Sequence, residues 1–282
     1  MPARVLIING NPMDATARIA ALGGRPYGEG YSSALRFFEP ELEFTILDAA
    51  DGGTLPAGVA LSDFDGAAWT GSALSAYEDK PEVGRQIALA RAVHAARLPC
   101  FGSCWGQQIM CQALGGEVRA NPNGIEIGVA RAIVRTGAGR SHPMFSGKME
   151  RFDALTVHRD EVVTLPPGAR ILASNAMSAI QAMDLRGTAG DFWGVQYHPE
   201  FDLHLMGVLF RRDRQALLEQ GLYKDSDAIA GTIADFTALN DNPANAALAA
   251  KHHLGPGILD PAIRMAELGN WLKVKVLPRA AV

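Results

Sequence analysis

Cys104 is a candidate nucleophile because of the segment around it. Residues 101–108 read Phe-Gly-Ser-Cys-Trp-Gly-Gln-Gln, with an apolar run before the cysteine and a helix-like run after it. A strand, a tight turn and a helix in that order raise the central side chain to where a substrate carbonyl can reach it. At a helix start, backbone N–H groups and the helix dipole would also stabilise a thiolate. The alternative is a buried core cysteine, and the presence of a base with its own orienting partner decides between the two.

His198 and Glu200 supply that base and its partner. They lie in residues 193–200, which read Trp-Gly-Val-Gln-Tyr-His-Pro-Glu. Pro199 biases His198 toward extended backbone, and residues two apart on an extended segment face the same side. The carboxylate of Glu200 can therefore fix the imidazole tautomer and stabilise its charge. Cys104, His198 and Glu200 thus form a candidate catalytic triad.

The elements that must position these residues alternate between strand and helix over the first two-thirds of the chain. That alternation predicts an open, doubly wound α/β sheet flanked by helices. In such sheets active sites lie at the carboxyl ends of strands, where Gly71, Cys104 and His198 fall. Strands are expected at residues 4–9, 44–47, 66–70 and 100–103, and a helix at 81–97.

From Gly124 onward the pattern changes to strand-like segments with no long helix between them, which predicts an antiparallel run added to the sheet. These segments are residues 125–135, 152–158, 169–174, 179–185 and 192–197. A helix is expected next, followed by three short ones, at 203–220, 226–240, 243–253 and 261–272. We therefore predict a core domain over residues 1–221 and a helical C-terminal appendage over 222–282. Apolar residues at helical spacing in the appendage need cover, either from the core or from a second copy in a homo-oligomer.

Together the motifs resemble the class I (triad) glutamine amidotransferases. Gly-x-Cys-x-Gly-x-Gln followed by Tyr-His-Pro-Glu is similar to that family, with the strongest likeness to the amidotransferase half of GMP synthase and its stand-alone relatives. The likeness extends to residues 69–73, 142–145 and 158–162. It implies a mixed, flavodoxin-like sheet and hydrolysis of the side-chain amide of glutamine. Cys104 would attack the amide, and His198 would take the thiol proton and return it to the leaving ammonia. Water would then release glutamate from a γ-glutamyl thioester.

The resemblance also implies roles for four further residues. The backbone N–H groups of Gly71 and Trp105 would form the oxyanion hole, and Gln108 and His158 would contact the substrate glutamine. An ordinary strand-end turn and a surface glutamine are the alternatives for Gly71 and Gln108.

The chain departs from the family in two places. Relatives usually have Gly-Gly-Pro or Gly-Ser-Pro where this chain has Gly-Ser-Ala at 71–73, and without the proline we expect a looser loop. Relatives tend to have His-Gly-Asp where this chain has His-Arg-Asp at 158–160. Arg159 would either clash with the donor's carboxylate or add a contact to it.

Composition narrows the class of protein further. A net charge of −4 and the lack of any Lys/Arg run give no reason to expect nucleic acid as a partner. The apolar run at residues 5–8 is too short for a signal peptide or a membrane span. Three cysteines without metal-ligand spacing predict a reduced, cytoplasmic protein, with Cys100 and Cys111 in the core.

No cofactor or metal is expected, and no nucleotide-activating module is recognisable. The sequence has neither a Ser-Gly-Gly-x-Asp-Ser loop nor a P-loop. Any use of the ammonia would therefore belong to a separate acceptor synthetase subunit. Two other interpretations remain: a γ-glutamyl hydrolase that acts on a γ-glutamyl amide or peptide with water as acceptor, and a catalytically idle relative that binds a partner.

Overall fold

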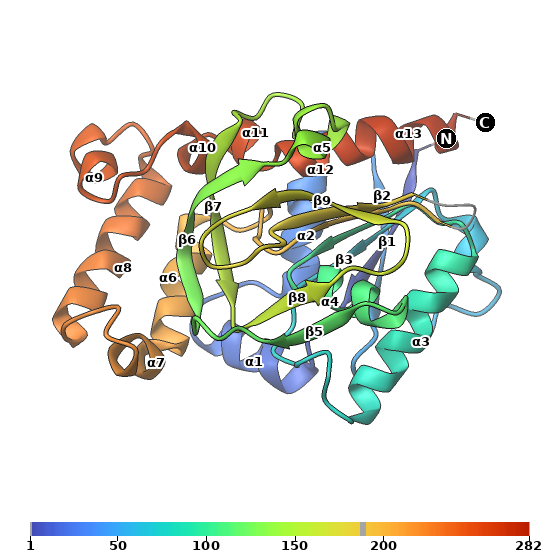
Figure 1. The fold of residues 1–282 in the computed structure, drawn as a ribbon, viewed down its shortest axis with the longest axis horizontal. Helices are drawn as coiled ribbons and strands as arrows, with labels where there is room; N and C mark the ends of the chain where they lie inside the picture. The colour runs from blue at the N-terminus through green and yellow to red at the C-terminus, as the bar shows by residue number, and fades with distance from the viewer. Residues whose placement is uncertain (1, 187–189, 282) are drawn as a thin grey trace.

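The computed structural model describes residues 2–186 and 190–281, in which helices flank a mixed sheet (Figure 1). The strands are β1 (Arg4–Asn9), β2 (Glu43–Asp48), β3 (Gly66–Trp69), β4 (Cys100–Ser103), β5 (Glu117–Ala120), β6 (Glu126–Arg135), β7 (Arg151–His158), β8 (Asp160–Thr164), β9 (Ala169–Ser174), β10 (Ala182–Leu185) and β11 (Phe192–Val195). Within the described residues the main sheet has nine strands in the order β2-β1-β3-β4-β11-β10-β9-β6-β7, and β5 pairs with β8 in a separate ribbon.

The parallel half of this sheet places the candidate triad. Strands β2, β1, β3, β4 and β11 run parallel to one another. Residues 192–197 were predicted to belong to the antiparallel run. That prediction is wrong for one of the two neighbours of β11, which pairs antiparallel with β10 but parallel with β4. Ser103 and Val195 are register partners, so the two strands end side by side. The residues that follow them, Cys104 on one and His198 on the other, therefore emerge at the same edge.

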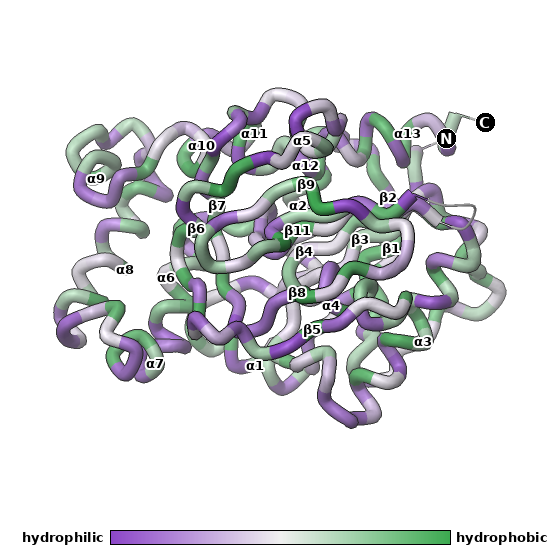
Figure 2. The backbone as a smooth tube through the Cα atoms, in the orientation of Figure 1, coloured by the Kyte–Doolittle hydropathy of each residue, from purple (hydrophilic) through white to green (hydrophobic). Residues whose placement is uncertain are grey.

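Helices cover both faces of the sheet, and the alternation of side chains along β1 decides which residues meet which helices. The helices up to residue 219 are α1 (Met13–Ala21), α2 (Tyr27–Arg36), η1 (Leu61–Asp63), α3 (Pro81–Ala95), α4 (Trp105–Ala113), α5 (Gly137–Arg140), η2 (Pro143–Phe145), α6 (Leu203–Arg212) and α7 (Arg214–Glu219). Val5 and Ile7 belong to the buried cluster that includes α2, whereas Leu6 and Ile8 belong to the cluster that includes α3 and α4. Hydrophobic and hydrophilic segments alternate along α3, as expected for a helix with one buried face (Figure 2).

Two helices between the first two strands were not predicted. The sequence pattern indicates no helix between residues 9 and 43, yet α1 and α2 both lie there. The predicted helix 203–220 is in fact two helices, α6 and α7, which are separated at Asp213. Asp213, at this break, lines the cavity described below.

The C-terminal helices pack on the core. They are α8 (Ser226–Asp241), α9 (Ala246–Lys251), α10 (Pro256–Leu259), α11 (Pro261–Arg264), α12 (Ala266–Trp271), η3 (Leu272–Val276) and α13 (Leu277–Ala280). The Trp271 ring lies 6.1 Å from that of Phe101 on β4. A Cβ on Gly66 of β3 would come within 2.9 Å of Trp271, so a glycine is needed there. The appendage thus supplies part of the layer over one sheet face, and the domain boundary at residue 221 stays a prediction.

Among the described helices, none combines the length and apolar character needed to cross a bilayer.

Candidate active site

Cys104 occupies a strained turn between β4 and α4. Its backbone has φ 50° and ψ −100°. A positive φ is unfavourable for any residue that has a side chain, so the turn is strained. Two glycines make room for the turn. A Cβ on Gly102 would lie 2.5 Å from the carbonyl carbon of Gly106, and one on Gly106 would lie 2.7 Å from the Trp69 carbonyl oxygen. The turn is held to the neighbouring strand because Cys104 N–H donates to the Val195 carbonyl at 2.7 Å.

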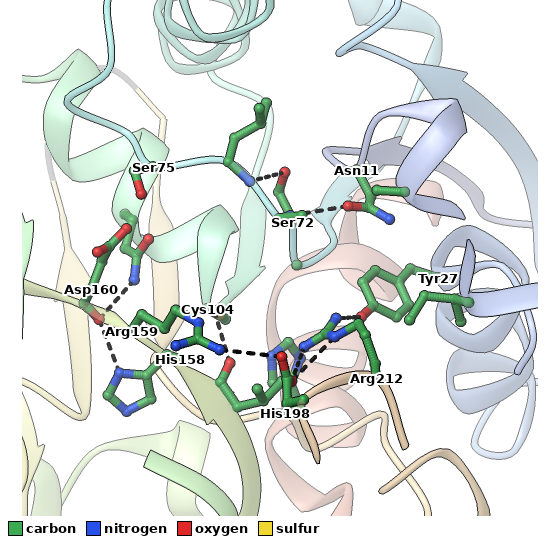
Figure 3. A pocket seen from close by; sticks show the side chains of 18 of the residues that line it. Asn11, Tyr27, Ser72, Ser75, Cys104, His158, Arg159, Asp160, His198 and Arg212 are labelled. Atoms are coloured by element: carbon green, nitrogen blue, oxygen red, sulfur yellow. Dashed lines mark hydrogen bonds and ion pairs between the residues drawn. The ribbon is translucent and has the colours of Figure 1, made fainter. Parts of the chain in front are cut away.

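His198 and Glu200 are paired as their spacing indicates. His198 Nδ1 and Glu200 Oε1 are 2.7 Å apart, and the Phe201 ring stacks on the imidazole at a centroid distance of 3.8 Å. His198 is buried, and within the described part of the chain its Nε2 has no hydrogen-bond partner. The ring lines the same cavity as Cys104 (Figure 3). With Nδ1 held by the carboxylate, Nε2 is the atom left to exchange a proton.

The second oxygen of Glu200 is also fixed. Ser103 Oγ donates to Glu200 Oε2 at 2.9 Å, and Tyr31 OH lies 2.8 Å from the same Ser103 oxygen. Because Ser103 gives its hydrogen to the carboxylate, the Tyr31 hydroxyl is the donor to Ser103. Neither residue was predicted as part of the site. A polar side chain at the end of the apolar strand β4 was a signal for Ser103, whereas Tyr31 lies on a helix that was not predicted.

Burial of the Cys104 thiol disfavours its ionisation. Burial raises its pKa to about 12, and the negative charges of Glu200 and Asp160 act in the same direction, against the opposing N–H of Trp105. Burial therefore acts against the thiolate that the helix start was expected to stabilise. The thiol instead donates to the Val157 carbonyl at 3.6 Å.

Acidity does not distinguish Cys104 from the other two cysteines. Burial raises the pKa of Cys111 to about 12 and raises that of Cys100 as well. What sets Cys104 apart is that it lines a cavity together with His198.

The loop after β3 carries Gly71 against the histidine. A Cβ on Gly71 would lie 2.8 Å from His198 Cε1, so no side chain fits there without moving the ring. The Gly71 carbonyl accepts from Thr70 Oγ1 at 3.0 Å, and Ala73 N–H donates to Asn11 Oδ1 at 3.0 Å. We expected a looser loop without proline. The Asn11 contact supplies a restraint instead, through an N–H group that proline lacks.

The predicted donor-binding residues Gln108 and His158 both line the cavity. Gln108 Nε2 donates to the Asp160 carbonyl at 3.1 Å and to Gln196 Oε1 at 3.2 Å. His158 uses both ring nitrogens within the protein, Nδ1 with the Asp160 carbonyl at 2.9 Å and Nε2 with Glu126 Oε2 at 2.7 Å. Both partners offer oxygen atoms, so a ring nitrogen that carries a hydrogen donates it within the protein. His158 therefore fixes the Asp160 carbonyl, and a contact between its ring and a substrate stays a prediction.

Charged residues complete the cavity, which has a volume of about 200 Å³, and among them Arg212 and Asp213 were not predicted. Arg159 NH2 donates to Asp213 Oδ1 at 3.2 Å, and Arg212 NH2 donates to Asp213 Oδ2 at 2.6 Å. Arg212 NH1 also donates to the Tyr27 hydroxyl at 3.5 Å. Arg159, whose side chain is half exposed, thus pairs with Asp213 at the wall of the cavity.

Across the described residues no group of three or more His, Cys, Asp or Glu side chains is arranged to hold a metal ion.

The fold and the site define a class. A strained cysteine at a strand–helix turn, beside a His–Glu pair on the neighbouring parallel strand of an α/β sheet, is typical of enzymes that cleave amide bonds through a cysteine. The family model described as glutamine amidotransferase class-I matches residues 71–214. The chain belongs to this family, whose members are enzymes of the hydrolase or amidotransferase type.

Individual relatives agree with the family. A gamma-glutamyl-L-1-hydroxyisopropylamide hydrolase from Pseudomonas sp is 32% identical, in an alignment covering 98% of this chain and 94% of that protein. A glutamine-hydrolyzing GMP synthase from Thermomicrobium roseum is 35% identical over 56% of this chain and 26% of that protein. Among solved structures, a glutamine amidotransferase from Methylobacillus flagellatus shares the fold with a TM-score of 0.62 at 24% identity, over 99% of this chain and 94% of that one.

Proposed function

We propose that the chain hydrolyses the γ-amide bond of a γ-glutamyl compound, with Cys104 as nucleophile, His198 as general base and then acid, and Glu200 as its orienting partner. One observation carries this proposal. The 2.7 Å His198–Glu200 pair leaves Nε2 unpartnered within the described residues, on the wall of the cavity that Cys104 also lines. A buried imidazole with a free nitrogen in the cavity that holds the thiol is arranged for proton transfer.

The reaction follows from these groups. His198 Nε2 takes the thiol proton as the sulfur attacks the amide carbon, and the oxyanion is stabilised by the N–H groups of Gly71 and Trp105. The C–N bond then breaks, and His198 returns its proton to the departing nitrogen, so the amine leaves neutral. A γ-glutamyl thioester remains on Cys104. Water, deprotonated by His198, attacks it and releases glutamate and the free thiol.

The glutamyl group is placed by the opposite wall of the cavity. We assign it to Gln108 and to the segment 158–160, whose carbonyl at Asp160 is fixed by two donors. The Asp160 carboxylate, which accepts from the Tyr77 hydroxyl at 3.1 Å, and the Arg159 guanidinium offer opposite charges for the ammonium and carboxylate of an amino acid. Arg159 would thereby add a contact to the donor rather than clash with it.

The length of the similarity supports an N-substituted γ-glutamyl amide as the substrate, with water as acceptor. The Pseudomonas hydrolase aligns over 98% of this chain and so includes the C-terminal helices, whereas the Thermomicrobium GMP synthase alignment spans 56%. The second candidate substrate is glutamine, with ammonia passed to a separate synthetase subunit, and the GMP synthase relatives favour it.

The proposed function also includes a cytoplasmic location, which is supported by three unbridged cysteines.

Glutamate release by the purified chain tests the function. The substrates are glutamine and a γ-glutamyl alkylamide, and Cys104→Ala is the control. Turnover of the alkylamide without a partner, absent in Cys104→Ala and accompanied by an acyl-cysteine adduct in mass spectrometry, would support the hydrolase. Turnover of glutamine that rises when cell extract is added would favour the amidotransferase. Glutamate release that is equal in Cys104→Ala would overturn both.

A further inference from the structure

The cavity extends past the reacting atoms in two directions. Figure 3 shows Tyr27 and Arg212 on one side of Cys104, with Asp160 and His158 on the other. All of these residues line one continuous space of about 200 Å³. A γ-glutamyl group would fill one end of this cavity, and the other end then has no assigned ligand group.

The chemistry of amide cleavage indicates which end of the cavity binds the leaving amine. His198 must return its proton to the leaving nitrogen, so the leaving amine lies on the His198 side. Phe201 stacks on His198 at 3.8 Å, and the Tyr27 ring lies 5.6 Å from that of Phe201. Tyr27 and Cys104 also line the same cavity. The Tyr27 end therefore receives the leaving group.

We propose that Ala15, Ile19, Tyr27 and Arg212 form a leaving-group subsite, which binds the amine part of an N-substituted γ-glutamyl amide. The ligand class is a small alkylamine that carries a hydroxyl group. This inference rests on the proposed function and extends it by naming the residues that select one γ-glutamyl amide over another.

The walls of the subsite are apolar. Ala15 and Ile19 are buried on the same face of α1, four residues apart, and both line the cavity. The Tyr27 ring, 8% exposed, closes the space from α2. A bare ammonia leaving group would leave this surface uncovered, whereas the carbon atoms of an alkylamine would bury it.

The polar groups of the subsite suit a neutral hydroxyl rather than an anion. The Arg212 guanidinium already donates to Asp213 at 2.6 Å and so has a partner within the protein. The Tyr27 oxygen accepts from Arg212 at 3.5 Å, and its own proton has no acceptor within the part of the chain that the structure describes. Tyr27 can therefore donate to a hydroxyl oxygen on the amine.

The test uses three substrates with one acyl group, the γ-glutamyl amides of ammonia, isopropylamine and 1-hydroxypropan-2-amine. In the wild-type chain we expect kcat/KM to rise in that order. Tyr27→Phe removes the hydroxyl donor, so the advantage of the hydroxylated amide over the isopropylamide should fall about tenfold. Ala15→Leu fills the space, so the ratio of kcat/KM for the isopropylamide to that for glutamine should fall by about tenfold or more.

Ala17→Leu is the matched control, because it makes the same change on the exposed face of α1. It should leave all three ratios as in the wild type. Ratios that stay unchanged in both Tyr27→Phe and Ala15→Leu, while the wild type still turns over the amides, would overturn the subsite and leave the proposed function intact. If the wild type turned over none of the three amides, the proposed function itself would fail, and the subsite with it.

Discussion

Ser103 Oγ donates to Glu200 Oε2 at 2.9 Å, from the residue directly before the candidate nucleophile. The turn that presents Cys104 is therefore bonded through its neighbour to the carboxylate that orients His198. Tyr31, buried on α2, donates in turn to Ser103 at 2.8 Å. These contacts make Ser103 and Tyr31 positioning residues for the triad.

Ser103→Ala should lower kcat about tenfold with a smaller change in KM, because Glu200 loses a hydrogen bond to a charged group. Tyr31→Phe should have a smaller effect in the same direction, because it acts through Ser103. Steady-state kinetics measure both effects, with the exposed Ser33→Ala on α2 as control. A rise in KM as large as the fall in kcat would contradict the positioning role and indicate a general structural loss.

Alkylation of Cys104 by iodoacetamide should accelerate about tenfold per pH unit between about pH 6 and pH 9, because the thiolate is the reactive form. The sign follows from burial, which raises the pKa of Cys104 to about 12 and so keeps the thiol protonated over this whole range. Peptide mapping should find the label on Cys104 before Cys100 or Cys111, which do not line the cavity. A rate that levels off below about pH 8 would mean that the thiolate is already formed at rest.

Glu200→Gln should weaken catalysis less than Cys104→Ala does. By analogy with other triads, loss of the orienting carboxylate costs about 10⁴-fold in kcat, and loss of the nucleophile costs about 10⁶-fold. The glutamine at position 200 keeps an oxygen that can accept from His198 Nδ1, whereas alanine at position 104 can form no thioester. Single-turnover assays on one γ-glutamyl amide make the comparison, and equal residual rates in the two variants would mean that these roles are misassigned.

Acid stability should depend on Asp184, a buried residue on β10. Although burial opposes it, hydrogen bonds from His142 and Arg170 hold the pKa of the Asp184 carboxyl well below its usual range. A lowered folded-state pKa gives stability that is present above the unfolded value of about 4 and is lost as pH falls below it. Urea unfolding between about pH 5 and pH 2 should therefore show a shallower loss in Asp184→Asn than in the wild type. Asp14→Asn, at an exposed pair with Arg18, should change that slope little.

Local sequence was sufficient to propose the candidate triad and to predict most strands, because the turn around Cys104 and the spacing of His198 and Glu200 are short-range patterns. The direction of β11 was not predictable in this way, since its parallel pairing with β4 joins segments far apart in the chain. Helix α2 was not predicted either, because tertiary packing rather than local sequence stabilises it. Its sequence, Tyr-Gly-Glu-Gly-Tyr-Ser-Ser-Ala-Leu-Arg, holds two glycines and two serines, which are weak helix formers. Burial of Tyr31 and Leu35 against the sheet stabilises the helix instead.

Lys148 and Glu267 join the predicted appendage to the core, and their pair provides the last prediction. Lys148 Nζ lies 2.7 Å from Glu267 Oε1, with both side chains almost fully buried, and the Tyr197 hydroxyl donates to the same carboxylate oxygen at 2.6 Å. Lys148→Met should lower the free energy of unfolding by about 3–5 kcal/mol, because Glu267 is left as an uncompensated buried charge. The double variant Lys148→Met/Glu267→Leu should recover part of that loss, since it removes both charges together. Urea unfolding of the single and double variants completes the cycle. If the two single losses simply added, the pair would not couple the C-terminal helices to the core, and residues 222–282 would be held there by their apolar contacts alone.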